Sequence, residues 1–400
     1  MTDPDVSSKV GAMRIASVTA RCLGYRKTDP PMARAFVVVR VETDTGVVGW
    51  GEASSNWGHS YPTVVETVIR DVIAPNLEGT DALALRDRVG QMHVLLDGYL
   101  GWEGLSSQVI GAVEIALWDI AGKVHGASIS QLLGGGVDTI PLYGTGTTMF
   151  EESADWHAHY FDEALSHGFR NVKVRLGKNP DADVELVRVV KDHIGPDKRV
   201  MADAYWGYSP EEAIALTDRL KPYGLYFFEE PCPQYDVDGL ARLAARSLPV
   251  RVAGGERIYS PAQFRLLAER GAIHVFQPDA TLCGGILACL DIMAIARAFG
   301  LEVIPHVGGP TAIGLAANLQ WAAAAHVPMI EWDIDPHQPL VDTLAPELAL
   351  REVRDGVTII PDGPGLGIDF DEAVLDEFPH ERGDTYAEVF TDHETGRINA

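Results

Sequence analysis

The sequence is poor in cysteine: its 400 residues include only Cys22, Cys232, Cys283 and Cys289, and no two of them form a CxxC pair. This scatter argues against a disulfide framework and against a structural zinc site, and it favours a reducing compartment. Residues 1–13 lack the apolar core of a secretory signal. No uncharged apolar run approaches the roughly 18 residues that a membrane-spanning helix needs. We therefore expect a cytoplasmic protein that does not contact a membrane.

Basic residues are also scarce, since 32 lysines and arginines stand against 57 aspartates and glutamates, a formal net charge of −25. An acidic surface without a dense basic run repels phosphate backbones, so nucleic-acid binding is not expected. The hydrophobic fraction of 46% is that of a folded, enzyme-sized protein. A chain of this length exceeds what one hydrophobic core normally serves, so we expect more than one domain.

The first third of the chain has the pattern of an α+β domain. Residues 34–54 contain two β-rich runs joined by a glycine-containing turn, the pattern of a hairpin. Apolar residues then recur at helical spacing over 62–75, 81–96 and 104–126. We therefore place an N-terminal α+β domain at residues 1–135.

From about residue 139, short β-rich runs alternate with amphipathic helical stretches. The eight predicted runs are 139–144, 171–176, 199–205, 225–231, 250–256, 273–279, 301–307 and 329–333. Strict alternation favours parallel pairing, and eight repeats favour a closed (β/α) barrel, an α/β fold, over an open sheet. An open doubly wound sheet is the weaker alternative because no GxGxxG follows the first run. We expect the barrel at residues 136–340 and a C-terminal segment, 341–400, that returns to the first domain.

Polar residues recur at the carboxyl ends of these runs. In chain order they are Lys173 and Arg175, Asp203, Glu229, Glu256, Asp279, His306 and Glu331. Their spacing is about one strand–helix unit, so in a barrel they converge on one rim, where barrel enzymes have their active sites. A single acid after a strand could equally cap the next helix. A polar residue after each of seven consecutive runs favours a site.

Three carboxylates, Asp203, Glu229 and Glu256, follow three adjacent strands. Carboxylates held together stay ionised only if a cation compensates them, and an all-oxygen ligand set points to a hard ion such as Mg²⁺. The alternative is that one of them pairs with an arginine such as Arg257. Glu230 should point the other way along its strand, as a buried structural partner.

Asp279 and His306 follow consecutive strands. A carboxylate beside an imidazole fixes its tautomer and raises its basicity, which makes a general acid/base. A lone histidine at this position would more often be structural, but the register of His306 with the carboxylates favours catalysis. The remaining histidines, including His157 and His159, follow no pattern and are interpreted as surface residues.

Together these motifs resemble the enolase superfamily, and specifically the mandelate racemase/muconate lactonizing enzyme family. Residues 112–135 are similar to the helix that leads into the family's barrel, and FFEEP (227–231), AGGE (253–256) and QPDATLCGG (277–285) resemble its strand-end motifs. The resemblance covers nearly the whole chain. It implies a modified TIM-like barrel with an N-terminal α+β capping domain, one Mg²⁺ and a small carboxylate substrate. We also expect a homo-oligomer.

The resemblance assigns roles to the rim residues. Asp203, Glu229 and Glu256 match the metal ligands, Asp279 with His306 matches the mandelate-racemase-type dyad, and Glu331 matches the acid that faces the substrate carboxylate. Removal of a proton next to a carboxylate creates an enediolate, whose charge the metal, Lys173 and Glu331 would compensate. Glu331 must be protonated to donate a hydrogen bond, which a crowded acidic site would favour.

Two positions depart from the family pattern. Arg175 stands where a lysine is usual; a guanidinium is a poor base and a good carboxylate clamp. Tyr205 stands where asparagine is frequent and is a candidate substrate contact. Specificity in this family lies in two capping-domain loops, here near 24–34 and 54–62, so Arg26, Trp57 and His59 are further candidates for substrate binding.

The leading functional hypothesis is an Mg²⁺-dependent dehydratase of a sugar acid, an aldonate or aldarate. His306 would remove the α-proton and assist loss of the β-hydroxyl, giving a 2-keto-3-deoxy acid. The alternatives are a cycloisomerase of a sugar-acid lactone or anhydro-acid, and a racemase or epimerase, for which Arg175 is a poor second base. A non-catalytic relative and Schiff-base chemistry through Lys173 are less favoured.

Overall fold

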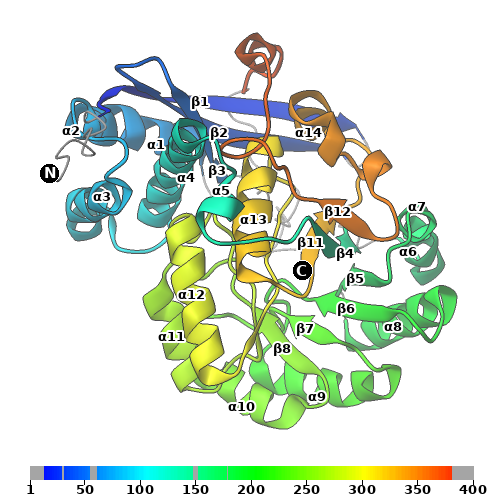
Figure 1. Ribbon diagram of the computed structural model, residues 1–400. Helices are drawn as coiled ribbons and strands as arrows, with labels where there is room; N and C mark the ends of the chain where they lie inside the picture. The colour runs from blue at the N-terminus through cyan, green and yellow to red at the C-terminus, as the bar shows by residue number, and fades with distance from the viewer. Residues whose placement is uncertain (1–12, 29–30, 55–60, 147–151, 178, 381–400) are drawn as a thin grey trace, which may run out of the picture.

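The computed structural model describes residues 13–28, 31–54, 61–146, 152–177 and 179–380. A small antiparallel sheet with its own helices lies at one end of a larger, curled parallel sheet that is surrounded by helices (Figure 1). The expected architecture, a (β/α) barrel with an N-terminal α+β part, is confirmed. Among the described helices, none is both long enough and apolar enough to cross a membrane.

The N-terminal sheet has three antiparallel strands in the order β1 (Ile15–Thr28), β2 (Pro31–Thr43) and β3 (Val48–Ser54). The predicted hairpin is confirmed, since β2 pairs with β3 and Gly46 between them has a φ of 82°, which glycine adopts without steric cost. The helices that follow are α1 (Pro62–Val68), a π-helical turn (Ile69–Ile73), α2 (Ala74–Leu77), α3 (Leu85–Leu100), α4 (Leu105–His125) and α5 (Ile129–Leu132).

Two glycines let β3 lie directly on α4. A Cβ at Gly51 would be 1.9 Å from the carbonyl oxygen of Ala112, and a Cβ at Gly49 would be 2.1 Å from that of Ala116. No larger residue fits this contact. Because side chains alternate along a strand, Glu52 faces away from α4, toward the larger sheet.

The larger sheet contains eight parallel strands hydrogen-bonded in the order β10-β9-β8-β7-β6-β5-β4-β11. They are β4 (Thr139–Thr145), β5 (Asn171–Arg175), β6 (Arg199–Asp203), β7 (Phe227–Glu229), β8 (Arg251–Gly254), β9 (Val275–Phe276), β10 (Glu302–Val303) and β11 (Ile330–Asp333). Each predicted β-rich run supplies one of these strands. At the seam between the outermost strands, Glu331 N donates to the Pro305 carbonyl at 3.4 Å, which brings the two edges together.

Helices cover the outside of the curled sheet (Figure 1). They are α6 (Ala154–Tyr160), α7 (Asp162–Ser166), α8 (Pro180–Ile194), α9 (Pro210–Leu220), α10 (Val237–Ser247), α11 (Pro261–Glu269), α12 (Ile286–Phe299), α13 (Ala312–Ala325) and α14 (Pro339–Leu344). Their starts follow from the sequence: at α9, Ser209 accepts from the Glu212 amide, Glu212 accepts from the Ser209 amide, and Pro210 occupies the first turn. Inside the curl lies a separate apolar cluster, formed by Tyr143, Met201, Phe227, Ala253, Val275, Ile304 and Met329.

The chain after β11 runs back toward the N-terminal sheet. Three short 3₁₀ helices, Pro346–Leu348, Leu350–Glu352 and Glu372–Glu377, flank β12 (Val357–Ile359), which pairs antiparallel with β4. Further on, Gly24 N donates to the Phe378 carbonyl at 3.1 Å. These contacts join the C-terminal segment to both sheets.

Candidate active site

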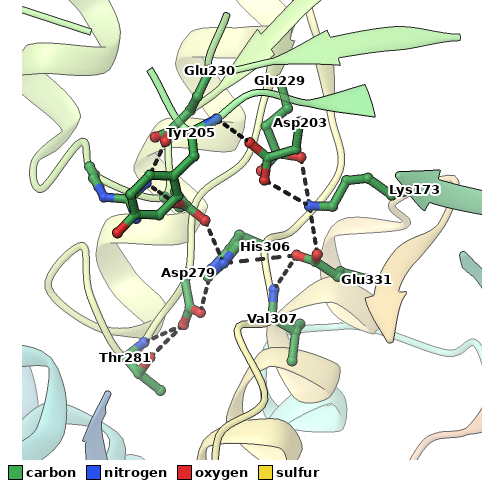
Figure 2. A network of polar contacts seen from close by, with 12 residues as sticks. Lys173, Asp203, Tyr205, Glu229, Glu230, Asp279, Thr281, His306, Val307 and Glu331 are labelled. Carbon is green, nitrogen blue, oxygen red and sulfur yellow. Dashed lines mark hydrogen bonds and ion pairs between the residues drawn. The ribbon is translucent and has the colours of Figure 1, made fainter. Parts of the chain in front are cut away.

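The strand register places the first rim residues side by side. In the strand register, Arg175 of β5 lies opposite Asp203 of β6, and Asp203 lies opposite Glu229 of β7. Because parallel strands share one direction, their side chains reach the same end of the barrel. Figure 2 shows that Lys173, Asp203, Glu229, His306 and Glu331, which lie on or just beyond different strands, point toward one another.

Lys173 lies at the centre of this cluster and is fully buried. Its Nζ is 2.7 Å from Glu229 Oε2, 2.6 Å from Glu331 Oε1 and 3.8 Å from Asp203 Oδ2 (Figure 2). A buried ammonium is stable only when anions compensate it, and here three carboxylates do so. Lys173 is therefore arranged as a cationic hydrogen-bond donor.

The structure brings Asp279 and His306 into direct contact. His306 Nδ1 is 3.0 Å from Asp279 Oδ2, and both residues are buried. The other oxygen of Asp279 accepts from Thr281 N at 2.9 Å, Thr281 Oγ1 at 2.7 Å and Asn318 Nδ2 at 2.9 Å. Burial opposes ionisation of Asp279, but the His306 imidazole and these hydrogen bonds outweigh it and hold its pKa below the ordinary value. An ionised Asp279 fixes Nδ1 of His306 as the donor and leaves Nε2 for proton transfer.

The Nε2 atom of His306 points into the carboxylate cluster. It is 2.7 Å from Glu256 Oε2 and 3.9 Å from Glu331 Oε2. Glu256 therefore lies next to the dyad. Figure 2 shows the contact between His306 and Glu331 on the neighbouring strand.

The expectation of a protonated Glu331 is wrong for this arrangement. Burial raises the pKa of Glu331, but Lys173, followed by His306 and Arg175, lowers it below the ordinary value. The ionised carboxylate accepts hydrogen bonds from Lys173 and from Val307 N, the latter at 3.0 Å. The number of acids favoured protonation in the sequence, but the buried lysine between them decides the charge.

The three candidate metal ligands each contact a cationic side chain. Arg175 pairs with Asp203, Lys173 with Glu229, and Arg257 with Glu256. The pairing with Arg257 is the alternative that the sequence left open. Over the described ranges, no three His, Cys, Asp or Glu side chains converge at metal-ligating separations. Each carboxylate instead lies against a neighbouring positive charge.

Their donor chemistry nevertheless suits a divalent cation. Glu229 Oε1 is buried and has no hydrogen-bond or ion-pair partner among the described residues, whereas Asp203 Oδ2 has the ion pair with Arg175 and the more distant Lys173. Buried carboxylate oxygens are costly unless paired or metal-bound. Asp203 and Glu229 lie on strands in register, with Glu256 beyond the next strand, and together they form an all-oxygen set of the kind that Mg²⁺ prefers.

Glu230 and Tyr205 have other partners. Glu230 lies just past the end of β7 with a φ of 40°, and it accepts from Gln234 and Arg257. The Tyr205 ring lies 4.0 Å from the Arg257 guanidinium, while its backbone N–H donates to Asp203 Oδ1 at 2.9 Å. Glu230 thus has the structural place predicted for it, and Tyr205 sits half-buried beside the carboxylates.

The capping-loop candidates have mixed outcomes. Trp57 and His59 lie outside the described residues, and Arg26 is exposed near the end of β1, so their roles stay predictions. The surface interpretation is wrong for His157, which is 4% exposed on α6 and lines a cavity of about 210 Å³ with Arg175. It holds for His159, which is exposed.

Sequence reasoning missed the residue that orients Asp279. Asn318 lies on α13, whose sequence AIGLAANLQWAAAA is otherwise almost entirely apolar. A buried polar residue on an apolar helix needs a partner, and that was the available signal. Which partner it meets depends on tertiary packing.

The capped barrel and its rim of carboxylates, lysine and histidine define an enolase-like enzyme fold. Family models match most of the chain: "Mandelate racemase / muconate lactonizing enzyme, N-terminal domain" over residues 30–134 and "Enolase C-terminal domain-like" over residues 157–374. The chain therefore belongs to the mandelate racemase/muconate lactonizing enzyme family of the enolase superfamily.

Relatives within this family act on sugar acids or their lactones. D-galactarolactone cycloisomerase of Agrobacterium fabrum is 34% identical over 392 residues, which cover 92% of this chain and 99% of the relative. Arabinonate dehydratase of Saccharolobus solfataricus is 32% identical, with 86% of this chain and 90% of the relative covered.

Solved structures share the whole fold. An enolase-superfamily member from Polaromonas is 28% identical with a TM-score of 0.86, covering 94% of this chain and 100% of that chain. A racemase from Streptomyces coelicolor with bound magnesium is 25% identical with a TM-score of 0.79, covering 92% of this chain and 100% of that chain.

Proposed function

We propose that the protein is an Mg²⁺-dependent dehydratase of a sugar acid, an aldonate or aldarate. Asp203, Glu229 and Glu256 would hold the metal. A bound Mg²⁺ supplies positive charge to the substrate carboxylate as the α-proton leaves. The substrate class rests on the sugar-acid relatives, of which arabinonate dehydratase is one.

The observation that carries the proposal is the one-sided acid/base set. Asp279 holds His306 with Nε2 directed into the cluster, whereas the opposite side presents Lys173, clamped between two carboxylates, and Arg175. Neither cation is a good base in that state. A single imidazole suits an elimination in which one group performs both proton transfers.

The residues then divide the reaction between them. His306 Nε2 takes the α-proton, and Asp279 stabilises the imidazolium that forms. Lys173 and Arg175 provide positive charge beside the developing enediolate. The imidazolium returns its proton to the β-hydroxyl on the same face, the C–O bond breaks, and water and an enol leave. The enol becomes the 2-keto-3-deoxy acid.

Cycloisomerisation of a sugar-acid lactone is the second candidate, favoured by the 34% identity to D-galactarolactone cycloisomerase over 99% of that relative. The same α-proton abstraction would be followed by departure of the lactone ring oxygen, which opens the ring without loss of water. The two activities differ in the leaving group and not in the base.

A substrate panel tests the proposal. The purified protein with Mg²⁺ is incubated with aldonates, aldarates and aldarolactones, and products are followed by 2-keto-acid detection and proton NMR. A dehydratase converts an open-chain acid to a 2-keto product one water lighter. Ring opening of a lactone at unchanged mass would favour the cycloisomerase, and an epimerised substrate would favour a racemase. No turnover of any open-chain acid would reject the dehydratase proposal.

A further inference from the structure

A buried carboxylate of the N-terminal sheet reaches into the barrel. Glu52 lies on β3 and is fully buried. Its oxygens accept from Thr311 N at 3.1 Å, Thr311 Oγ1 at 2.5 Å and Gly314 N at 2.8 Å. These donors form the N-terminus of α13, whose partial positive charge favours a carboxylate. Glu52 therefore caps a barrel helix from the other domain.

The close approach depends on Gly314. A Cβ there would lie 2.8 Å from Glu52 Oε2, which is shorter than the contacts that real Cβ atoms make. The same segment begins near the dyad, because Thr311 follows His306 by five positions in the chain. Glu52 thus anchors the far end of the loop that starts at His306.

The capped helix also supports Asp279. Asn318 lies four residues after Gly314, one turn along the same face of α13. Its Nδ2 donates to Asp279 Oδ1 at 2.9 Å, and its Oδ1 accepts from Ala280 N at 3.0 Å and Trp321 Nε1 at 2.9 Å. Because Ala280 N and Trp321 Nε1 both donate to Asn318 Oδ1, the orientation of the Asn318 amide is fixed.

A continuous set of contacts therefore links the N-terminal sheet to the base. It runs from Glu52 through α13 and Asn318 to Asp279 and ends at His306 Nδ1. A parallel contact acts on the neighbouring helix: Glu114 of α4 accepts from Ile286 N at 2.8 Å and Leu287 N at 2.9 Å at the start of α12, just after the loop that follows Asp279.

We propose that Glu52 is a positioning residue for the Asp279–His306 dyad, acting through α13 and Asn318. This role rests on the proposed function only in that His306 is the base. The capping domain then contributes to the alignment of the proton-transfer groups as well as to the cover over the substrate.

Asp119 provides a matched control. It is another buried carboxylate of the N-terminal part and accepts backbone N–H groups from Trp50 and Leu366, each at 2.9 Å. Those contacts join α4 to β3 and to the C-terminal segment, away from the dyad. Glu52→Gln and Asp119→Asn both remove a buried charge, but only the first touches α13.

The variants are compared at pH 8, above the pKa of about 7 to which burial raises Glu52. For Glu52→Gln we expect kcat to fall at least tenfold with KM changed less than threefold. Asp119→Asn should lower the melting temperature and keep the wild-type kcat. In a double-mutant cycle, Glu52→Gln added to Asn318→Ala should cost much less than it does alone, because both act on the same contact.

A spectroscopic readout needs no substrate. In ¹⁵N-histidine-labelled protein, the low-field Nδ1 proton resonance of His306, identified by its loss in His306→Asn, reports the bond to Asp279. We expect it to shift or broaden in Glu52→Gln and to stay unchanged in Asp119→Asn. If Glu52→Gln does not fold, Thr311→Val removes the hydroxyl that donates to Glu52 and accepts from Ile313 N at the start of α13, and it should show a change in the same direction.

Wild-type kcat and an unchanged resonance in Glu52→Gln or, if it does not fold, in Thr311→Val would overturn the inference, as would equal losses of kcat in Glu52→Gln and Asp119→Asn. An altered resonance in a protein that turns over no sugar acid would instead reject the proposed function and leave the positioning role standing.

Discussion

Asp279→Asn tests how the dyad works, because the structure dictates how the new amide must lie. Oδ1 of Asp279 accepts from Thr281 N, Thr281 Oγ1 and Asn318 Nδ2 at 2.7 to 2.9 Å. The carbonyl oxygen of an asparagine must therefore take that place, which turns its NH₂ group toward His306 Nδ1, 3.0 Å from the present carboxylate. His306 Nδ1 must then accept, and the proton moves to Nε2.

An imidazole protonated at Nε2 cannot take the α-proton, although the side chains keep their positions. General-base catalysis contributes roughly 10²–10⁴-fold, and a wrong tautomer in a serine-protease triad costs about 10⁴-fold. We expect kcat to fall by about 10³-fold, equivalent to about 4 kcal/mol of activation free energy. KM should change little, because Asp279 does not face the candidate metal ligands, where the substrate would bind.

The assay is steady-state turnover of the best substrate from the panel, with ¹⁵N NMR of the histidine ring to establish the tautomer. Asp291→Asn, which removes an exposed carboxylate on α12, is a control for the loss of one negative charge. An Asp279→Asn enzyme that keeps more than a tenth of wild-type kcat, with Nε2 protonated, would refute the reasoning.

Three further variants test other parts of the site. Asp203→Asn should weaken Mg²⁺ binding at least about tenfold in calorimetry, whereas Glu302→Gln, a partly buried carboxylate on β10, should not; equal affinities would remove Asp203 from the metal site. Arg175→Lys should raise KM by about ten- to a hundredfold, the value of a charge-assisted hydrogen bond, with kcat nearly kept; a collapse of kcat alone would make Arg175 part of proton transfer. Burial raises the pKa of Glu114 to about 7, so its contribution to stability is present at low pH and is lost as pH rises through that value. Wild-type unfolding free energy should fall relative to Glu114→Gln between about pH 5 and 7, by up to about 1.4 kcal/mol per pH unit; parallel curves would contradict this.

The fold was predictable because the signals are local and repeated. Each barrel strand is a β-rich run bounded by a polar residue and a helix cap such as Ser209, so eight runs could be found without tertiary information. Asp279 and His306 could be paired because consecutive parallel strands place their carboxyl ends together.

The charge state and the support of the site were not predictable in the same way. Glu331 is ionised because Lys173, far away in sequence, lies 2.6 Å from it. Glu52 meets Thr311 across 259 positions of the chain, and Asn318 meets Asp279 across 39. Such contacts depend on how the two domains and the helices pack, which hydrophobic periodicity does not encode.

The central claim is that His306 alone removes the α-proton, and exchange in D₂O tests it most directly. Wild-type protein with Mg²⁺ should convert an accepted sugar acid to product with deuterium at C3, and the recovered substrate should show deuterium only at the α-position and without inversion. His306→Asn should show neither product nor α-exchange while it still binds Mg²⁺. Continued α-exchange in His306→Asn would contradict the account. So would α-exchange that is lost in Arg175→Ala and kept in His306→Asn.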